Sequence, residues 1–413
     1  MNNSSKHYSV LSIPVIVAAL GYFVDIYDLL LFTIVKKPSM MAIGSTDATL
    51  LTDSTKVINL QMVGLLLGGI IWGMMGDKKG RLSVLFGSIV LYSIANFATG
   101  FVQNVDQYAW ARFVAGLGLA GELGAGITLV SELLPKNKRG IGTSLVAGIG
   151  LSGAVVAYFT FHFTQDWRLC YKIGGVLGIM LLLLRVSVAE SGMFNQVKEQ
   201  KVSRGNFFMF FTDLTRFRKY IFAILIGLPT WFCIGILINQ SARFGKEFFG
   251  STTIDSGRAI MFAYILISIG DILIGFVSQY FKSRKKALYL YYAMTILFGI
   301  VYFSPFNNSN TSMYIISALL GFGTGFWAIF VTMGAEQFGT NLRATAATTI
   351  PNMVRGSLPL MNLLFKDVFH DKLQWSLWQS AVVTGIIVMI ITLIAAYFTE
   401  ETYHKDLEYV EVI

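Results

Sequence analysis

The sequence contains few charged residues. Only 13% of its 413 residues are Asp, Glu, Lys or Arg, whereas 54% are hydrophobic. A soluble domain carries about a quarter charged residues, so this composition excludes an ordinary soluble protein and predicts an integral membrane protein. The formal net charge of +9 would suggest nucleic-acid binding in a soluble chain. In a membrane protein, an excess of Lys and Arg in cytoplasmic loops explains it instead.

Cysteine and enzymatic motifs are also scarce. The two cysteines, Cys170 and Cys233, lie in apolar runs and are expected to be small buried hydrophobes rather than a disulfide or a metal site. No nucleophile constellation, metal-ligand cluster or phosphate loop occurs in a polar segment of the sequence, so we expect neither an enzyme nor a cofactor. The polar start "MNNSSKHYS" runs directly into a full-length apolar segment, so no cleavable signal peptide is expected.

Apolar runs long enough to cross a bilayer, about 20 residues, recur along the whole chain. They predict an all-α integral membrane fold with twelve spans, at 9–35, 55–76, 82–102, 107–131, 140–163, 167–187, 219–240, 257–280, 286–304, 312–335, 343–366 and 376–399. The longest polar interruption divides the spans into six and six. We therefore expect an N-terminal six-helix bundle at 1–187, a cytoplasmic linker at 188–218, a C-terminal six-helix bundle at 219–400 and a cytoplasmic tail at 401–413.

Positive charge predicts the orientation. The basic clusters "GDKKGR", "PKNKRG", "KSRKK" and the linker all fall on one side if both termini are cytoplasmic. We expect a multi-pass protein of a bacterial inner membrane.

The two halves of the sequence also repeat each other, because Glu132 with Arg139 recurs half a chain later as Glu336 with Arg343. Repeated six-helix halves are typical of transporters whose site lies between them.

Two motifs resemble the major facilitator superfamily, and the resemblance extends over essentially the whole chain. "GMMGDKKGR" is similar to that family's loop between helices 2 and 3, and "ARFVAGLGLAGELGAGITLVSELLPKNKRG" to its helix 4 and the following loop. The resemblance implies a secondary transporter that works by alternating access. It also implies an interdomain charge network that forms a cytoplasmic gate, with the candidate residues Gly73, Asp77, Gly80, Arg81, Glu132, Arg139, Glu336 and Arg343. The second-half loop departs from the pattern at Gln279, where the aspartate is missing, so we expect an asymmetric gate.

Acidic residues within the spans resemble those of metabolite:proton symporters. "GYFVDIYDLLLF" places Asp25 and Asp28 at that family's two acidic positions, and "AGEL" places Glu122 at its intramembrane glutamate. Arg112 occupies the position at which such symporters pair an arginine with a helix 1 acid. The two aspartates are three residues apart and share one helix face, so they should repel and one is expected to hold a proton.

We therefore assign proton coupling to these four residues without choosing among the acids. Arg112 either biases the proton affinity of its partner or forms a permanent structural pair. The predicted fifth span lacks the Gly-Pro signature of antiporters, which disfavours drug/proton exchange. Asp271, towards the cytoplasmic end of the span 257–280, is expected to belong to the gate.

A permanent positive charge lies within "ATAATTIPNMVRGSLPLMNLLF". Arg355 falls between Pro351 and Pro359, and an arginine at the bilayer midplane costs roughly 2.5 kcal/mol or more. The prolines should bend this helix and turn free carbonyls toward a cavity. Arg355 is therefore predicted to bind an anionic group of a substrate, since guanidinium suits bidentate capture of a carboxylate. The alternative is an ion pair with Asp25, Asp28 or Glu122. Weaker substrate-binding candidates are Asn352, Asn239, Gln240, Tyr264 and Trp327.

These features together predict a proton-coupled symporter of a small organic anion or zwitterion. A sugar or polyol symporter is the rival interpretation, favoured by Trp327 in "GFGTGFW", which resembles sugar porters. An organic-cation carrier that uses the three acids is a third, and the intact gate motifs oppose a non-transporting sensor. We expect a monomer in the lipid bilayer, with protons as the coupling ion and no nucleic-acid partner.

Overall fold

A computed structural model describes residues 9–46, 49–184, 205–405 and 409–411. Over that part of the chain, every regular element is helical. The elements are α1 (Ile13–Ala42), α2 (Leu50–Lys79), α3 (Arg81–Thr99), α4 (Val105–Leu119), α5 (Glu122–Leu133), α6 (Lys136–Leu151), α7 (Gly153–Thr164), α8 (Trp167–Leu184), η2 (Phe207–Phe211), α10 (Leu214–Leu225), α11 (Leu228–Phe232), η3 (Cys233–Ile238), α12 (Ser241–Phe249), α13 (Ser256–Phe281), α14 (Arg284–Tyr302), α15 (Asn310–Gly323), α16 (Trp327–Glu336), α17 (Arg343–Gly356), α18 (Leu358–Asn362), η4 (Leu363–Lys372) and α19 (Leu377–Phe398).

Nine helical segments of the described chain are long and apolar enough to cross a membrane, and Ser83–Thr99 is a shorter apolar helix. The remaining predicted spans, 286–304 and 343–366, fall on α14 and on the helical run from α17 to η4. The all-helical membrane architecture is thus confirmed, whereas the number twelve stays a prediction.

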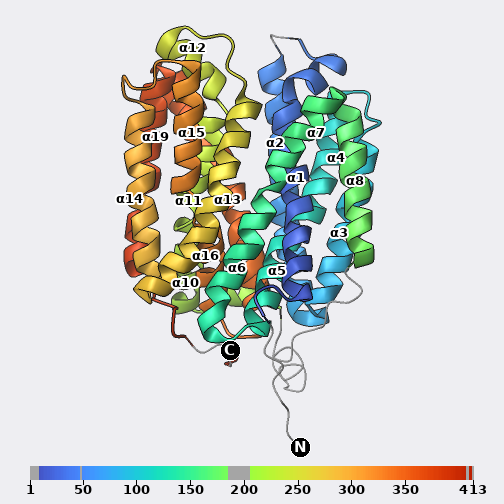
Figure 1. Cartoon of the computed structure of the whole chain (residues 1–413), viewed down its shortest axis with the longest axis vertical. Coiled ribbons are helices and arrows are strands. Elements are labelled where there is room, and N and C mark those ends of the chain that lie inside the picture. Colours follow the sequence, from blue (N-terminus) through green and yellow to red (C-terminus); the bar gives the residue numbers. More distant parts are fainter. Residues whose placement is uncertain (1–8, 47–48, 185–204, 406–408, 412–413) are drawn as a thin grey trace, which may run out of the picture.

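The helices form two groups side by side (Figure 1). We call α1–α8 the N-terminal half and α10–α19 the C-terminal half. The start of α1 and the C-terminal tail lie at the same end of the molecule, and α12 lies at the opposite end. The predicted bundle and linker boundaries stay predictions, because 185–204 lies outside the described residues and α10 already begins at Leu214.

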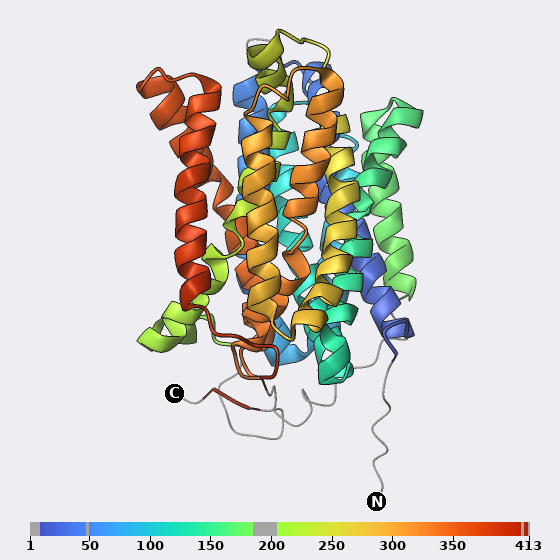
Figure 2. The same cartoon turned by 60° about the vertical axis from the view of Figure 1, so that its left-hand side comes forward.

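Apolar side chains cover the outside of both halves. Leu183, Ile300 and Tyr397 are 71%, 64% and 72% exposed. Figure 2 shows α14 and α19 as long helices on the outside of the molecule, and both carry exposed apolar residues along their length. Exposed apolar surface of this extent marks a lipid-facing surface. Cys170 and Cys233 are free and buried, as the sequence predicts.

Several spans are interrupted at glycine-rich or proline-containing stretches. The fourth predicted span breaks between Leu119 and Glu122, the tenth between Gly323 and Trp327, and the eleventh at Ser357. An interrupted helix leaves backbone groups unpaired, which a membrane tolerates only where protein or a cavity covers them. The last of these breaks lies two residues from Arg355, as its flanking prolines predict.

Glycines let the two halves approach closely at the end where the termini lie. There α2 and α5 pack against α17, and α6 packs against α13. A Cβ atom on Gly73 would lie 3.0 Å from the Cα of Thr345, and one on Gly124 would lie 2.4 Å from the Cα of Thr348. Small residues at these positions allow backbone-to-backbone contact between helices.

Gly124→Ala is therefore expected to push the halves apart at this end, because the neighbouring atoms belong to backbone that cannot move aside. Overpacking costs about 1–3 kcal/mol, which corresponds to a shift of roughly 5- to 150-fold toward the open form. Gly126→Ala on the same helix is the matched control, since its Cβ atom would meet only the Cβ of Ala18 at 3.6 Å.

Spin labels on the exposed positions of Lys138→Cys and Lys286→Cys, one in each half, would report the separation by pulsed electron paramagnetic resonance. The native cysteines are buried and should not react. An unchanged distance distribution in Gly124→Ala, equal to that of Gly126→Ala, would contradict the role of this contact.

Candidate functional site

Asp77 joins the two halves at the gate. Its Oδ1 accepts the N–H of Ala344 at 3.1 Å, and its Oδ2 accepts the N–H and hydroxyl of Thr345 at 2.8 and 2.6 Å. These N–H groups lie in the first turn of α17, where backbone donors lack helical partners and the helix dipole favours a negative charge. A carboxylate of the N-terminal half thus caps a helix of the C-terminal half.

Two further contacts close this end. Glu336 forms a buried ion pair with Arg284, with 2.6 Å between Oε1 and Nη2. A Cβ atom on Gly140 would lie 3.2 Å from Nη1 of the same arginine, so Arg284 reaches the N-terminal half. The hydroxyl of Thr332 donates to that of Thr143 across the interface at 3.1 Å. Sequence reasoning missed Arg284, although its cluster "KSRKK" is evident.

The other predicted gate residues are placed as follows. Gly80 separates α2 from α3 at a φ of 97°, a backbone conformation that favours glycine. Arg343, the first residue of α17, is buried and donates to the carbonyl of Phe338 at 3.4 Å. The side chains of Arg81, Glu132 and Arg139 lie outside the described part of the structure.

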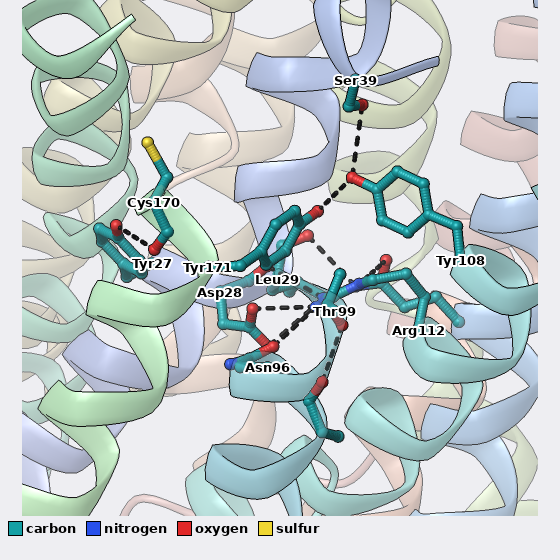
Figure 3. Close-up of polar contacts among 12 residues, drawn as sticks. Tyr27, Asp28, Leu29, Ser39, Asn96, Thr99, Tyr108, Arg112, Cys170 and Tyr171 are labelled. Atoms are coloured by element: carbon teal, nitrogen blue, oxygen red, sulfur yellow. Dashed lines mark hydrogen bonds and ion pairs between the residues drawn. The ribbon is translucent and has the colours of Figure 1, made fainter. Parts of the chain in front are cut away.

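Arg112 and Asp28 form an ion pair inside the N-terminal half (Figure 3). Nη1 lies 3.0 Å from Oδ1, Nη2 lies 3.3 Å from Oδ2, and both side chains are fully buried. Nη1 also donates to Asn96 at 2.8 Å, and Nη2 to the carbonyl of Asp28 at 3.1 Å. The geometry is that of the predicted pairing between the fourth and first spans.

Further groups surround this pair. The guanidinium of Arg112 lies 5.2 Å from the ring centre of Tyr171, whose hydroxyl lies 2.7 Å from that of Tyr108. Gln61 supports the pair from α2 and donates to the carbonyl of Leu29 at 3.2 Å. An ion pair with its hydrogen-bonding capacity filled in this way suits a structural role as well as a coupling role.

Arg355 lies between the halves, in surroundings of neutral groups. Nη1 donates to Oδ1 of Asn352 at 3.0 Å, and Nη2 lies 3.5 Å from the hydroxyl of Tyr22. The guanidinium faces the ring of Trp327 at 5.6 Å. The structure thus brings together the predicted residues Arg355, Asn352, Trp327 and Tyr264, and adds Tyr22 of α1, which sequence reasoning did not identify.

A cavity at Arg355 is lined by unsatisfied donors. Tyr22, Tyr264 and Trp231 contribute aromatic walls. Three further polar groups belong to residues that line the cavity: Nε of Arg355, Nε1 of Trp327 and the hydroxyl of Thr230. None of these groups has a hydrogen-bond partner among the described residues. Buried donors normally have partners, so three unsatisfied donors on residues that line one cavity indicate a binding site.

The cavity is closed in this conformation, with room for about one water molecule. Leu29, Trp231 and Ile234 also line a second small cavity, which adjoins a third at Lys36, toward the C-terminal end of α1. A metabolite needs a larger volume, so the halves must separate before one can bind at Arg355.

The predicted substrate residues Asn239 and Gln240 do not line the cavity at Arg355. They line the third cavity together with Lys36, whose Nζ lies 3.5 Å from Oδ1 of Asn239. Lys36 belongs to the N-terminal half and Asn239 to the C-terminal half, so the contact crosses between them. Their role in binding substrate stays a prediction.

Asp25 and Glu122 are fully or almost fully buried, at 0% and 1% exposure. Glu122 begins α5, immediately after the break in the fourth span. Asp25 lies one helical turn from Tyr22, and Tyr22 is within electrostatic range of Asp25, Arg355 and Asp271. Asp28 is paired with Arg112, whereas Asp25 and Arg355 both lie within electrostatic range of Tyr22.

Comparisons with known proteins agree with this geometry. Residues 18–361 match the family model described as Major Facilitator Superfamily. The niacin transporter NiaP of Acinetobacter baylyi is 25% identical, over 97% of this chain and 96% of its own length. The 3-(3-hydroxy-phenyl)propionate transporter of Escherichia coli is 24% identical, over 71% of this chain and 72% of its own.

Among solved structures, a proton:xylose symporter, XylE, bound to 6-bromo-6-deoxy-D-glucose superimposes with a TM-score of 0.77. It covers 96% of this chain and 97% of the other, at 15% identity, and therefore shows a shared fold. The family-model match covers most of the described chain, and the curated relatives are transporters. The chain is an integral membrane transport protein, not an enzyme, and it belongs to the major facilitator superfamily.

Proposed function

We propose that this transporter is a proton-coupled symporter of a small organic anion, and specifically of an aromatic carboxylate. It would act as a monomer in a bacterial inner membrane, with both termini in the cytoplasm, and would alternate access by rocking its halves about the site at Arg355. In this orientation Asp77 and Arg284 belong to the cytoplasmic gate, and Lys36 lies near the outer face.

The observation that carries the proposal is the set of unsatisfied donors around Arg355. Its guanidinium is buried and contacts an amide and a phenol, so its positive charge is available to a ligand. Nε, together with Nε1 of Trp327 and the hydroxyl of Thr230, offers hydrogen bonds toward one cavity. A carboxylate supplies both the negative charge and the acceptor oxygens that these donors require.

The walls of the cavity favour an aromatic ring. Tyr22, Tyr264, Trp231 and Trp327 line it together with aliphatic side chains, and aromatic rings prefer stacked or edge-to-face contacts with such walls. Three of the relatives support this class, since niacin, 3-(3-hydroxyphenyl)propionate and the gentisate named for a third relative, from Corynebacterium glutamicum, are aromatic carboxylates. Others are named for sialic acid and 4-methylmuconolactone, which are not aromatic. A sugar would leave the charge of Arg355 uncompensated.

A parallel thermal-shift screen tests the substrate class. Purified full-length protein would be heated with nicotinate, gentisate, benzoate, xylose, glucose and choline, each at several concentrations. A ligand present at 100 times its Kd adds about 2.7 kcal/mol of stability, so the aromatic carboxylates should raise Tm in a concentration-dependent way. Stabilisation by the sugars or by choline alone would refute the proposed class.

A further inference from the structure

A second buried acid lies beside the substrate cavity. Asp271 of α13 is fully buried, and its Oδ1 accepts the N–H of Ala328 at 2.8 Å. Ala328 is the second residue of α16, directly after the break in the tenth span. Asp271 therefore caps a half-helix in the interior of the protein, instead of contributing to the gate as its sequence position had led us to expect.

The second carboxylate oxygen of Asp271 does not take part in the helix cap. Oδ2 of Asp271 is buried and has no hydrogen-bond partner among the described residues. A helix cap needs only one acceptor oxygen, which a neutral amide or hydroxyl supplies equally well. An ionised carboxylate with one bare oxygen is costly to bury. An aspartate at this position therefore differs from an amide or a hydroxyl in that it can bind a proton and become neutral.

The groups that face Asp271 are few. Tyr22 of α1 and Tyr291 of α14 lie within its electrostatic range. The hydroxyl of Tyr291 donates to the carbonyl of Gly270 at 2.7 Å, so this proton is already engaged. On α16, Ala328 contacts Asp271 while its neighbour Trp327 contacts Arg355. The acid and the fixed cation thus contact two consecutive residues at the start of one half-helix.

We propose that Asp271 is a proton-binding site of the C-terminal half, coupled to the anion site at Arg355. A proton adds to Oδ2 and converts the carboxylate to a neutral carboxylic acid, and the same proton leaves when the transporter faces the other side. Loading the proton removes a negative charge near the cavity and thereby favours entry of a substrate carboxylate. The assignment rests on the proposed function, because it supplies the proton for that symport.

Infrared spectroscopy of the full-length protein in lipid tests the assignment without a substrate. The carbonyl stretch of protonated carboxyl groups would be followed between about pH 5 and pH 9 in the wild type and in Asp271→Asn. The asparagine keeps an acceptor for the N–H of Ala328 but cannot titrate. A titrating carbonyl band present in the wild type and missing from the variant is the expected result.

Asp255→Asn is the matched control, because Asp255 also caps a helix, accepting the N–H of Gly257 at 2.8 Å, but is exposed. Its infrared titration should equal that of the wild type. Asp271→Ser, which also keeps an acceptor and cannot titrate, must behave like Asp271→Asn. If both variants keep the full set of carbonyl bands of the wild type, Asp271 is a helix cap only and the proposal is overturned.

Transport measurements distinguish a failure of the Asp271 assignment from a failure of the proposed proton symport. Uptake of nicotinate and of 3-(3-hydroxyphenyl)propionate into proteoliposomes should rise at least tenfold with an inward proton gradient in the wild type. The same gradient should have no effect in Asp271→Asn, while exchange of substrate without net flux persists. A wild type that ignores the gradient overturns proton symport itself, whereas a variant that still responds overturns only the role of Asp271.

Discussion

Arg355→Gln is expected to reduce the affinity for carboxylate substrates at least 30-fold and to abolish their accumulation. Removing one member of a buried, hydrogen-bonded charge pair costs about 2–5 kcal/mol, and a tenfold change in affinity corresponds to about 1.4 kcal/mol. Glutamine keeps a hydrogen-bond donor but loses the charge. Isothermal titration with the carboxylates selected by the thermal screen measures the loss directly.

Arg355→Lys separates charge from geometry. Lysine retains the positive charge but not the planar fork that engages both carboxylate oxygens, so its affinity should fall between those of the wild type and of Arg355→Gln. Arg218→Gln removes an exposed arginine on α10, which contacts the ring of Phe222 on the same helix, and should leave binding unchanged. Arg355 would be excluded as the anion ligand if Arg355→Gln bound the carboxylates as tightly as this control.

Asp28→Asn is expected to give the largest loss of stability. Asp28 and Arg112 are both fully buried, and removing one partner of a buried pair leaves an uncompensated charge at a cost of about 3–5 kcal/mol. The neutral double variant Asp28→Asn/Arg112→Gln should recover much of this loss, since no charge remains buried. Thermal unfolding monitored in detergent, with the double-mutant cycle, gives the interaction energy.

An exposed ion pair of the same chemistry provides the control. Lys56 and Asp106 are paired with side chains 51% and 72% exposed, and pairs of this kind contribute about 0–1 kcal/mol. Asp106→Asn should therefore change Tm little. Equal effects of Asp28→Asn and Asp106→Asn would show that Arg112 finds compensation elsewhere, and the structural interpretation of the pair would fail.

Local patterns in the sequence were sufficient to predict much of this architecture. Hydropathy identifies the spans because a bilayer imposes a minimum length on each. The prolines beside Arg355 predict a break because proline removes a backbone donor, and the structure interrupts the helix at Ser357. The spacing around Asp77 and Arg112 matches known motifs. Arg112 pairs with an acid of the first span as predicted, whereas Asp77 contacts backbone N–H groups and a hydroxyl of the other half.

Contacts between distant segments could not be predicted in this way. Tyr22 and Arg355 are 333 residues apart, and no periodicity in the sequence indicates that they meet. The depth of Asp271 in its span suggested a gate residue, but the position of the break in a neighbouring helix determines its partner. Asn239 and Gln240 were predicted to be near the site from the span on which they lie, and the structure places them beside Lys36.

One amide connects ligand binding to the arrangement of the halves. Asn352 accepts from Arg355 through Oδ1, and its Nδ2 donates to the carbonyl of Ala120 at 2.9 Å, the group freed by the break in the fourth span. Ala120 belongs to the N-terminal half, so a substrate that draws Arg355 toward itself must also alter a contact between the halves. By linkage, a substrate that binds the inward- and outward-open forms with different affinities shifts the balance between them, and a change in that balance alters its apparent affinity in return. A single side-chain amide therefore links the anion site at Arg355 to a contact between the two halves.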